Sequence, residues 1–400
     1  MEGDFINIKE SLLPLSWLYG GVVGIRNFCF DVGMLKSRAF DVPVIAVGNI
    51  TVGGTGKTPH IEYLVRLLQK QFHVAVLSRG YKRKSHGYQL ADQQSTLCDI
   101  GDEPMQMKQK FPGISVAVDN KRVHGIERLT ADDERLDVIL LDDAFQHRYV
   151  KPGVNILLVD YHRLVIYDKL LPAGRLREPL SGKNRADIVI ITKCPKELKP
   201  MEFRVITKAM NLYPYQHLYF TTLAYDQPYP VFSKEAQPLA NGLANALKGQ
   251  HILLLTGIAS PRQLEEDLSP LITPTKGENG GSLSPLTFPD HHDFRHKDIE
   301  RINDTFAQMP SPKMIITTEK DAVRLTAAEG LSDEVRRHLY ALPVGIRFMQ
   351  QEQAEKFNDF IVGYVNKNSR HSILTKGKEE PKPKDNQSPS TTKKNTISFK

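Results

Sequence analysis

Short apolar runs alternate with helical patterns along the first half of the chain. The runs are rich in Val, Ile and Leu, and the segments between them place apolar residues at helical spacing. Strands and helices that alternate in this way predict a parallel α/β sheet. The predicted strands are residues 42–47, 74–78, 115–118, 138–141, 155–160 and 188–192.

A second alternating set begins near residue 216 and predicts a second sheet. Its predicted strands are residues 217–223, 251–258, 284–288, 313–318 and 340–349. Because 400 residues exceed one typical core, we predict a larger α/β lobe over residues 39–215 and a smaller one over 216–366. Residues 81–100 lack helical periodicity and contain a His86-Gly87 turn, so we predict a β-hairpin that projects from the first lobe.

Residues 1–38 form a separate N-terminal segment. Residues 12–25 contain no charge before Arg26, but a helix that spans a membrane needs about 20 apolar residues, so this stretch is too short. The residues alone leave two interpretations open. The segment is either an amphipathic helix in a membrane interface, with Trp17 and Tyr19 at headgroup level, or a helix buried against the first lobe.

The formal charge of +7 is concentrated near the C-terminus. Nine basic and three acidic residues lie within residues 367–400, so the rest of the chain is nearly neutral. We therefore expect no nucleic-acid partner, and no pattern indicates an obligate protein partner. The polar, basic segment 367–400 is predicted to be disordered. The three cysteines are far apart in sequence, which indicates neither a disulfide framework nor a zinc site and fits a reducing cytoplasm.

The segment from Gly48 to Pro59, GNITVGGTGKTP, links a predicted buried strand to a predicted helix. A glycine-rich turn before a helix start surrounds an anion with backbone N–H groups and the helix dipole. The strict P-loop pattern requires Gly where this chain has Thr51, but the glycines beside Lys57 make the closest approach. We therefore predict a nucleotide phosphate site formed by Gly53, Gly54, Thr55, Gly56, Lys57 and Thr58.

Acidic residues follow a predicted strand on the same edge of the sheet. Asp142 and Asp143 end the run 138–141, where a carboxylate beside a phosphate loop can meet Mg²⁺ together with the Thr58 hydroxyl. Asp102 and Glu103 open a predicted helix. Phosphoryl transfer to an alcohol needs a group that accepts the hydroxyl proton, and Asp102 is one candidate.

Polar side chains that could face a substrate lie on the same edge. The segment Ser78-Arg79-Gly80-Tyr81 ends the second strand, and Gln146 and His147 follow Asp143 in the chain. Arg177 lies on a loop bounded by Gly and Pro, where it could neutralise a transferring phosphoryl group.

Two adjacent histidines, His291 and His292, lie between acids in the second lobe. Adjacent residues on an extended segment point in opposite directions, and no third ligand has a metal-site spacing, so metal binding is disfavoured. We expect one histidine oriented by an acid and choose His291, beside Asp290.

With these segments in order, the chain resembles the lipid A 4'-kinase family, the tetraacyldisaccharide 4'-kinases. The motifs that carry the resemblance are GNITVGGTGKTP, SRGY, GDEP, DDAFQHR, LLPAGRLREP, FPDHHDF and TTEKDA, in this order between residues 48 and 322. The resemblance implies a P-loop NTPase-like lobe and a second α/β lobe joined by a β-ribbon. It also favours an interfacial N-terminal helix at the cytoplasmic face of the bacterial inner membrane.

The implied activity uses ATP and Mg²⁺. The γ-phosphoryl group passes to the 4'-hydroxyl of a tetraacyl disaccharide 1-phosphate, which gives the 1,4'-bisphosphorylated lipid A precursor, lipid IVA. The resemblance also implies roles for individual residues. Lys57 and Thr58 match the residues that bind phosphate and Mg²⁺, and Asp142 and Asp143 match the Mg²⁺ carboxylates, with Glu103 near the metal. Asp102 matches the catalytic base, His291 matches its partner, and Arg177 matches a residue that stabilises the phosphate. The residues expected to face the substrate are Arg79, Tyr81, Arg122, Gln146 and His147.

An alternative function is a regulatory P-loop NTPase that hydrolyses nucleotide to switch a partner. The same loop and acidic strand end motivate it. The two functions differ in one observable, because the NTPase would turn over ATP without a lipid acceptor.

Overall fold

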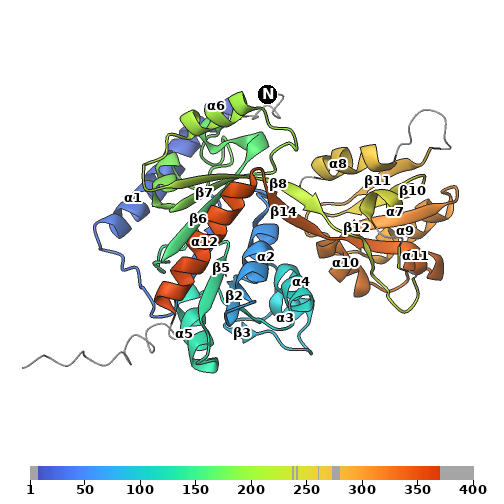
Figure 1. The fold of residues 1–400 in the computed structure, drawn as a ribbon, viewed down its shortest axis with the longest axis horizontal. Helices are drawn as coiled ribbons and strands as arrows, with labels where there is room; N and C mark the ends of the chain where they lie inside the picture. Colours follow the sequence, from blue (N-terminus) through green and yellow to red (C-terminus); the bar gives the residue numbers. More distant parts are fainter. Residues whose placement is uncertain (1–7, 237, 240–241, 260, 273–279, 370–400) are drawn as a thin grey trace, which may run out of the picture.

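The larger lobe is built on a nine-stranded sheet (Figure 1). The computed structural model describes residues 8–236, 238–239, 242–259, 261–272 and 280–369. In spatial order the strands are β14 (Val344–Phe348), β8 (His217–Tyr225), β7 (Ile188–Thr192), β6 (Val154–Asp160), β1 (Val44–Gly48), β5 (Val138–Asp142), β2 (Val74–Ser78), β4 (Ser115–Val118) and β3 (Gln89–Leu90). The pairs from β8 to β4 are parallel, and only the edge strands β3 and β14 are antiparallel to their neighbours. The parallel sheet predicted from the alternating runs is confirmed.

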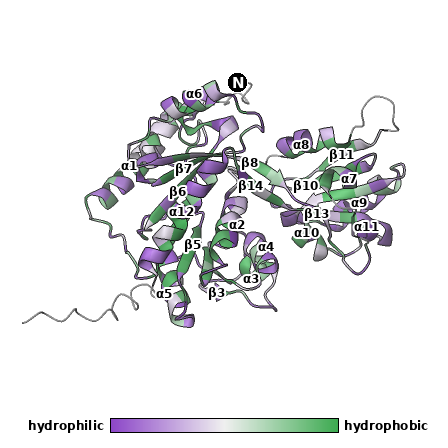
Figure 2. Cartoon of the chain, viewed as in Figure 1, coloured by the Kyte–Doolittle hydropathy of each residue, from purple (hydrophilic) through white to green (hydrophobic). Residues whose placement is uncertain are grey.

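Helices cover both faces of this sheet, which is why its central strands are apolar throughout. On one face α2 (Lys57–Leu68), α4 (Asp102–Lys110) and α12 (Gln351–Asn368) pack on strand residues such as Ile45. On the other face α5 (Arg122–Asp132) packs on residues such as Ala46 of β1, and α6 (Pro200–Met210) packs on residues such as Val159 of β6. Much of the hydrophobic colour in Figure 2 lies along the strands. The shorter helices of this lobe are η1 (Glu10–Leu12), α3 (Leu97–Ile100), η2 (Tyr161–Arg163), η3 (Val165–Tyr167) and η4 (Leu180–Arg185).

The smaller lobe has a five-stranded sheet. Its order is β11 (Ser282–Thr287), β10 (His251–Thr256), β12 (Lys313–Thr318), β13 (Leu339–Leu342) and β9 (Tyr229–Pro230), and only β9 is antiparallel. Its helices are α7 (Leu243–Leu247), α8 (Arg262–Ile272), α9 (His296–Ala307), α10 (Glu319–Thr326) and α11 (Asp333–His338). Phe306 of α9 is fully buried in the core of this lobe.

The two lobes are joined by the antiparallel pair β8 and β14 (Figure 1). The single strand predicted at residues 340–349 is wrong, because the chain divides at Pro343 into β13 in the small sheet and β14 in the large one. Proline has no N–H group to continue a ladder. The predicted range 216–366 for the second lobe therefore needs correction, since β8, β14 and α12 belong to the larger lobe.

The β-hairpin predicted at residues 81–100 is also wrong. Within this range only β3 is a strand, and it pairs with β4. Backbone carbonyls here are paired with a side chain instead of a second strand. The Arg83 guanidinium donates to the Gly87 carbonyl at 2.6 Å and to the Val118 carbonyl at 3.5 Å. The Lys84 N–H donates to the Cys98 carbonyl, which ties the segment to α3 without a ladder.

The N-terminal segment contains the helix α1 (Leu13–Asp31). One side contacts the first lobe, where Ser16 and Phe30 are buried, and the other side exposes large apolar residues. The contact with the first lobe agrees with the second interpretation on one side of the helix, and contact of the exposed side with a membrane stays a prediction. Among the described residues no helix is both long enough and apolar enough to cross a bilayer. The tail predicted to be disordered begins too early, because Lys367 and Asn368 belong to α12; residues 370–400 lie outside the described residues.

Candidate active site

A cavity of about 1110 Å³ lies between the two lobes and the N-terminal helix. Its lining includes almost every site residue predicted from the sequence. These are Gly53, Gly54, Thr55, Gly56, Lys57, Thr58, Arg79, Tyr81, Glu103, Arg122, Asp142, Asp143, Gln146, His147, Arg177 and His291. Asp102 does not line the cavity and is only 8% exposed.

The phosphate loop, residues 48–56, is held open by its own polar side chains and by its neighbours. Gly53 and Gly56 have φ values of 117° and 79°, which a residue with a Cβ rarely adopts. The Asn49 amide donates to the Thr55 hydroxyl at 3.0 Å, and the Thr192 hydroxyl donates to the Thr55 carbonyl at 3.0 Å. The loop is therefore shaped for an anion before any ligand binds.

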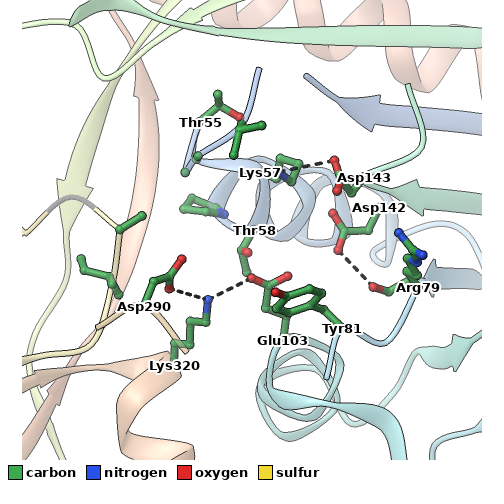
Figure 3. Close-up of a pocket in the computed structure, with 18 of the residues that line it drawn as sticks. Thr55, Lys57, Thr58, Arg79, Tyr81, Glu103, Asp142, Asp143, Asp290 and Lys320 are labelled. Atoms are coloured by element: carbon green, nitrogen blue, oxygen red, sulfur yellow. Dashed lines mark hydrogen bonds and ion pairs between the residues drawn. The ribbon is translucent and has the colours of Figure 1, made fainter. Parts of the chain in front are cut away.

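Lys57, at the start of α2, contacts the carboxylate of Asp143 (Figure 3), and Arg177 contacts the same carboxylate. The Lys57 Nζ and Asp143 Oδ1 are 3.4 Å apart, and the Arg177 Nη1 and Asp143 Oδ2 are also 3.4 Å apart. Burial alone would raise the pKa of Asp143, but the two cations outweigh it and hold the pKa below its ordinary value. Asp143 is therefore ionised, and two cations converge where phosphate oxygens would lie.

Asp142 differs from Asp143 in its surroundings. Burial, and then the like charges of Glu103 and Asp143, raise the pKa of Asp142 to about 7. Its Oδ2 accepts a hydrogen bond from the Ser78 hydroxyl at 3.3 Å, whereas its buried Oδ1 has no hydrogen-bond partner among the described residues. An unsatisfied buried carboxylate beside two more acids fits a divalent cation.

Protein side chains alone do not complete a metal site here. Within the part of the chain that the structure describes, no three His, Cys, Asp or Glu side chains converge on one point. A P-loop Mg²⁺ commonly takes its other ligands from phosphate oxygens and the loop hydroxyl, which is Thr58 in this chain. The residues therefore fit a cation that arrives with a nucleotide.

The second lobe supplies His291 to the opposite wall of the cavity. Its Nδ1 is 3.0 Å from the Asp102 Oδ2, and its ring centroid lies 4.8 Å from that of Tyr81. The neighbouring His292 instead contacts Asp298 within its own lobe at 2.9 Å. The contact with Asp102 therefore belongs to His291, the histidine chosen from the sequence.

Cations surround the Asp102 carboxylate. Burial would raise its pKa, but the hydrogen bond from His291 and the charges of Lys320 and Arg324 outweigh burial and hold the pKa well below its ordinary value. Lys320 lies between the lobes, with its Nζ 3.3 Å from Glu103 and 3.4 Å from Asp290 (Figure 3). The same Nζ is 3.0 Å from the His291 Nε2. Lys320 lies within the TTEKDA motif and Arg324 follows that motif on the same helix, but the sequence pattern predicts neither contact with the carboxylates at the start of α4.

A basic cluster lies beside α1. His147 is partly buried, and burial followed by the charges of Arg122, Arg26 and Arg79 lowers its pKa to about 4. The buried Arg122 donates to the Asp142 carbonyl at 3.1 Å, and its Nε has no partner among the described residues. Arg26 was missed from the sequence, where its only signal was the charge that ends the uncharged stretch 12–25.

The Gln146 side chain links neighbouring segments of the site by hydrogen bonds. Its amide donates to the Asn49 carbonyl in the phosphate loop and to Glu178 at 3.3 Å. From α1, the Tyr19 hydroxyl donates to the Arg177 carbonyl at 2.7 Å. The N-terminal helix, the phosphate loop and the Arg177 loop are therefore directly connected.

The parallel sheet, the glycine-rich loop and the Lys-Thr pair at a helix start define a P-loop NTPase-like protein. Comparison with known proteins narrows this class. Residues 8–362 match the family model described as LpxK, tetraacyldisaccharide-1-P 4'-kinase. The chain therefore belongs to the tetraacyldisaccharide-1-P 4'-kinase family.

Individual relatives agree over nearly the whole chain. A tetraacyldisaccharide 4'-kinase of Phocaeicola vulgatus is 56% identical over 375 residues, which cover 93% of this chain and 99% of the relative. One of Bacteroides thetaiotaomicron is 53% identical over 381 residues, with 94% and 98% covered. The crystal structure described as the "apo" form of LpxK from Aquifex aeolicus in complex with ATP has a TM-score of 0.66 and 28% identity, and covers 89% of this chain and 98% of that one.

Proposed function

We propose that this chain is an ATP-dependent kinase that phosphorylates the 4'-hydroxyl of a tetraacyl disaccharide 1-phosphate, which gives lipid IVA. The proposal is supported by the family and by one observation. Lys57 at the phosphate loop of the larger lobe and His291 of the smaller lobe line the same cavity, and His291 contacts Asp102. This arrangement brings a phosphoryl donor and a proton acceptor to opposite sides of one reacting centre.

The phosphate loop and Lys57 bind the β- and γ-phosphates, and Arg177 stabilises the charge of the transferring group. Thr58, Asp142 and Asp143, with Glu103 nearby, would hold Mg²⁺, which neutralises charge on the β- and γ-phosphates when bound. The apolar end of the cavity, lined by Leu223, Ile258, Leu264 and Val344, is suited to the adenine ring.

The Asp102 and His291 pair accepts the proton of the 4'-hydroxyl. The imidazole lines the cavity and the carboxylate behind it orients the imidazole. A pair shared between two lobes is assembled when the lobes come together, which excludes water and limits wasteful hydrolysis of ATP.

The acceptor enters beside α1. Arg26, Arg79 and Arg122 form a site for its 1-phosphate, and Tyr81, Gln146 and His147 face its sugars. One side of α1 lines the cavity while the other exposes Leu18, Val22 and Ile25. The acyl chains can therefore remain in a bilayer at the cytoplasmic face of the inner membrane while the headgroup reaches the cavity.

The experiment follows the γ-phosphate of labelled ATP with Mg²⁺ in detergent micelles, with and without the acceptor. Label in the lipid that depends on Lys57 supports the kinase. Free phosphate at a rate unchanged by the lipid would favour the regulatory NTPase and overturn the proposal.

A further inference from the structure

Arg324 is a buried cation at the seam between the lobes, and it is 8% exposed. One end of its guanidinium is fixed within its own lobe, because Nη1 donates to the Asp321 Oδ1 at 3.0 Å. Asp321 is fully buried and accepts further hydrogen bonds from the Gly257 N–H at 2.8 Å and the Thr318 hydroxyl at 2.7 Å. The small lobe therefore fixes the position of the guanidinium at the ends of β10 and β12.

The other end of the guanidinium reaches the larger lobe. Nη2 donates to the Oδ2 of Asp102, the first residue of α4, and lies 3.1 Å from the His291 Nδ1. Lys320, one helical turn earlier on α10, forms the neighbouring contact with Glu103. Helix α10 packs against α4, so these two cations meet two successive carboxylates at the start of α4.

The contacts of Asp102 can be counted against what a carboxylate accepts, which is about four hydrogen bonds. Its Oδ1 accepts the Glu103 N–H at 3.0 Å, and its Oδ2 is approached by Arg324 and His291. Three positions are thus engaged by described residues, and together they fix the plane of the carboxylate. A buried carboxylate that lost the guanidinium would be free to rotate or to leave its position against His291.

We propose that Arg324 is a positioning residue that reaches across the seam between the lobes and holds Asp102 against His291 in the catalytic arrangement. The inference rests on the proposed function. It assigns to Arg324 no contact with ATP or acceptor, since Arg324 does not line the cavity. Arg324 acts through Asp102, with Asp321 as its anchor.

The test compares the full-length protein with Arg324→Gln, Arg324→Lys and the control Arg336→Gln. Arg336 forms an ion pair with Glu235 at 2.9 Å in the same lobe, so its loss removes a matched interaction away from the cavity. Misplacement of a reacting group costs about 100-fold, so we expect Arg324→Gln to lower kcat by about that factor with an unchanged KM for ATP. Arg324→Lys keeps the charge but reaches only one carboxylate, so it should recover part of kcat, and Arg336→Gln should match the parent.

A parent-like kcat for Arg324→Gln, or an equal loss of kcat and ATP affinity, would overturn the inference. If Arg324→Gln does not fold, Arg324→Lys carries the test, because a parent-like kcat in that variant has the same meaning. Small-angle scattering with ATP separates this inference from the proposed function, since it needs no acceptor. We expect a larger radius of gyration for Arg324→Gln than for the parent, and equal radii would count against the inference even if the parent transfers no label to lipid.

Discussion

The Oδ2 of Asp102 in the larger lobe lies 3.0 Å from the Nδ1 of His291 in the smaller lobe. The two residues are 189 positions apart in the chain. Their contact depends on the placement of one lobe against the other, and a P-loop and its acidic residues lie in the same cavity.

His291→Asn should lower kcat by about 100-fold, because general acid and base groups contribute 10²–10⁴-fold. ATP binding should be retained, since the phosphate loop lies in the other lobe. The check is steady-state transfer together with ATP affinity by calorimetry. His292→Asn is the matched control, because His292 contacts Asp298 and not Asp102. Equal losses in the two variants would contradict the assignment of His291.

Arg177→Gln should lower kcat by about 10²–10³-fold, because it removes a cation from a developing negative charge. The guanidinium of Arg177 is 3.4 Å from Asp143 at the phosphate loop, whereas Arg175 is exposed on the same loop. Arg175→Gln should therefore retain the parent rate. Steady-state kinetics of both variants at saturating ATP give the comparison, and similar rates would show that Arg177 has no role in transfer.

The triple substitution of Leu18, Val22 and Ile25 to Ser should weaken binding to anionic lipid vesicles by at least tenfold. These side chains are 69%, 63% and 67% exposed, and burial of one such side chain contributes about 1.5–3 kcal/mol. Vesicle cosedimentation measures the effect. Leu90→Ser, at an exposed apolar residue on β3, is the control, and an equal effect there would show that α1 is not the contact surface.

His60 should make the fold sensitive to mild acid. It is fully buried on α2, where burial lowers its pKa from 6.5 to about 4 despite a hydrogen bond to the Gly56 carbonyl. The unfolded chain therefore binds a proton at higher pH than the folded chain does. The contribution of His60 to the free energy of unfolding is fully present above about pH 6.5. It falls by up to about 3 kcal/mol as the pH drops to about 4.

Thermal unfolding between pH 4 and pH 7.5 checks this prediction. His60→Gln should flatten the dependence of Tm on pH in this window, while the exposed His86→Gln should leave it unchanged. An undiminished slope in His60→Gln would assign the acid sensitivity to other groups.

Local sequence patterns predicted the strands of the first lobe better than those of the second. Its strands are apolar runs buried on both faces, so each one shows in composition alone. The run 340–349 looked continuous although Pro343 divides it between two sheets, because local propensity does not report which sheet a residue joins. The turn around Arg83 was misread because one guanidinium side chain satisfies its carbonyls in place of a second strand.

Local patterns also predicted some residues of the site and not others. The residues at or after the carboxyl ends of β1 and β5 include Lys57, Thr58, Asp142 and Asp143, so their place after predicted parallel strands was sufficient to group them. The pairing of Asp102 with His291 came only from the family resemblance, because no local pattern encodes a contact between lobes. Arg324 was not recognised, since an arginine within a short helix looks like an ordinary surface residue until its burial is known.

The most direct test of the account is a double-variant cycle on the Asp102 and His291 pair. Transfer of labelled γ-phosphate to the acceptor is measured in a single turnover for the parent, Asp102→Asn, His291→Asn and the double variant. Residues that act as one unit are not additive, so the double variant should be no slower than the slower single variant. Rate losses that multiply, or single variants that transfer label at the parent rate, would contradict a proton-accepting pair shared between the lobes.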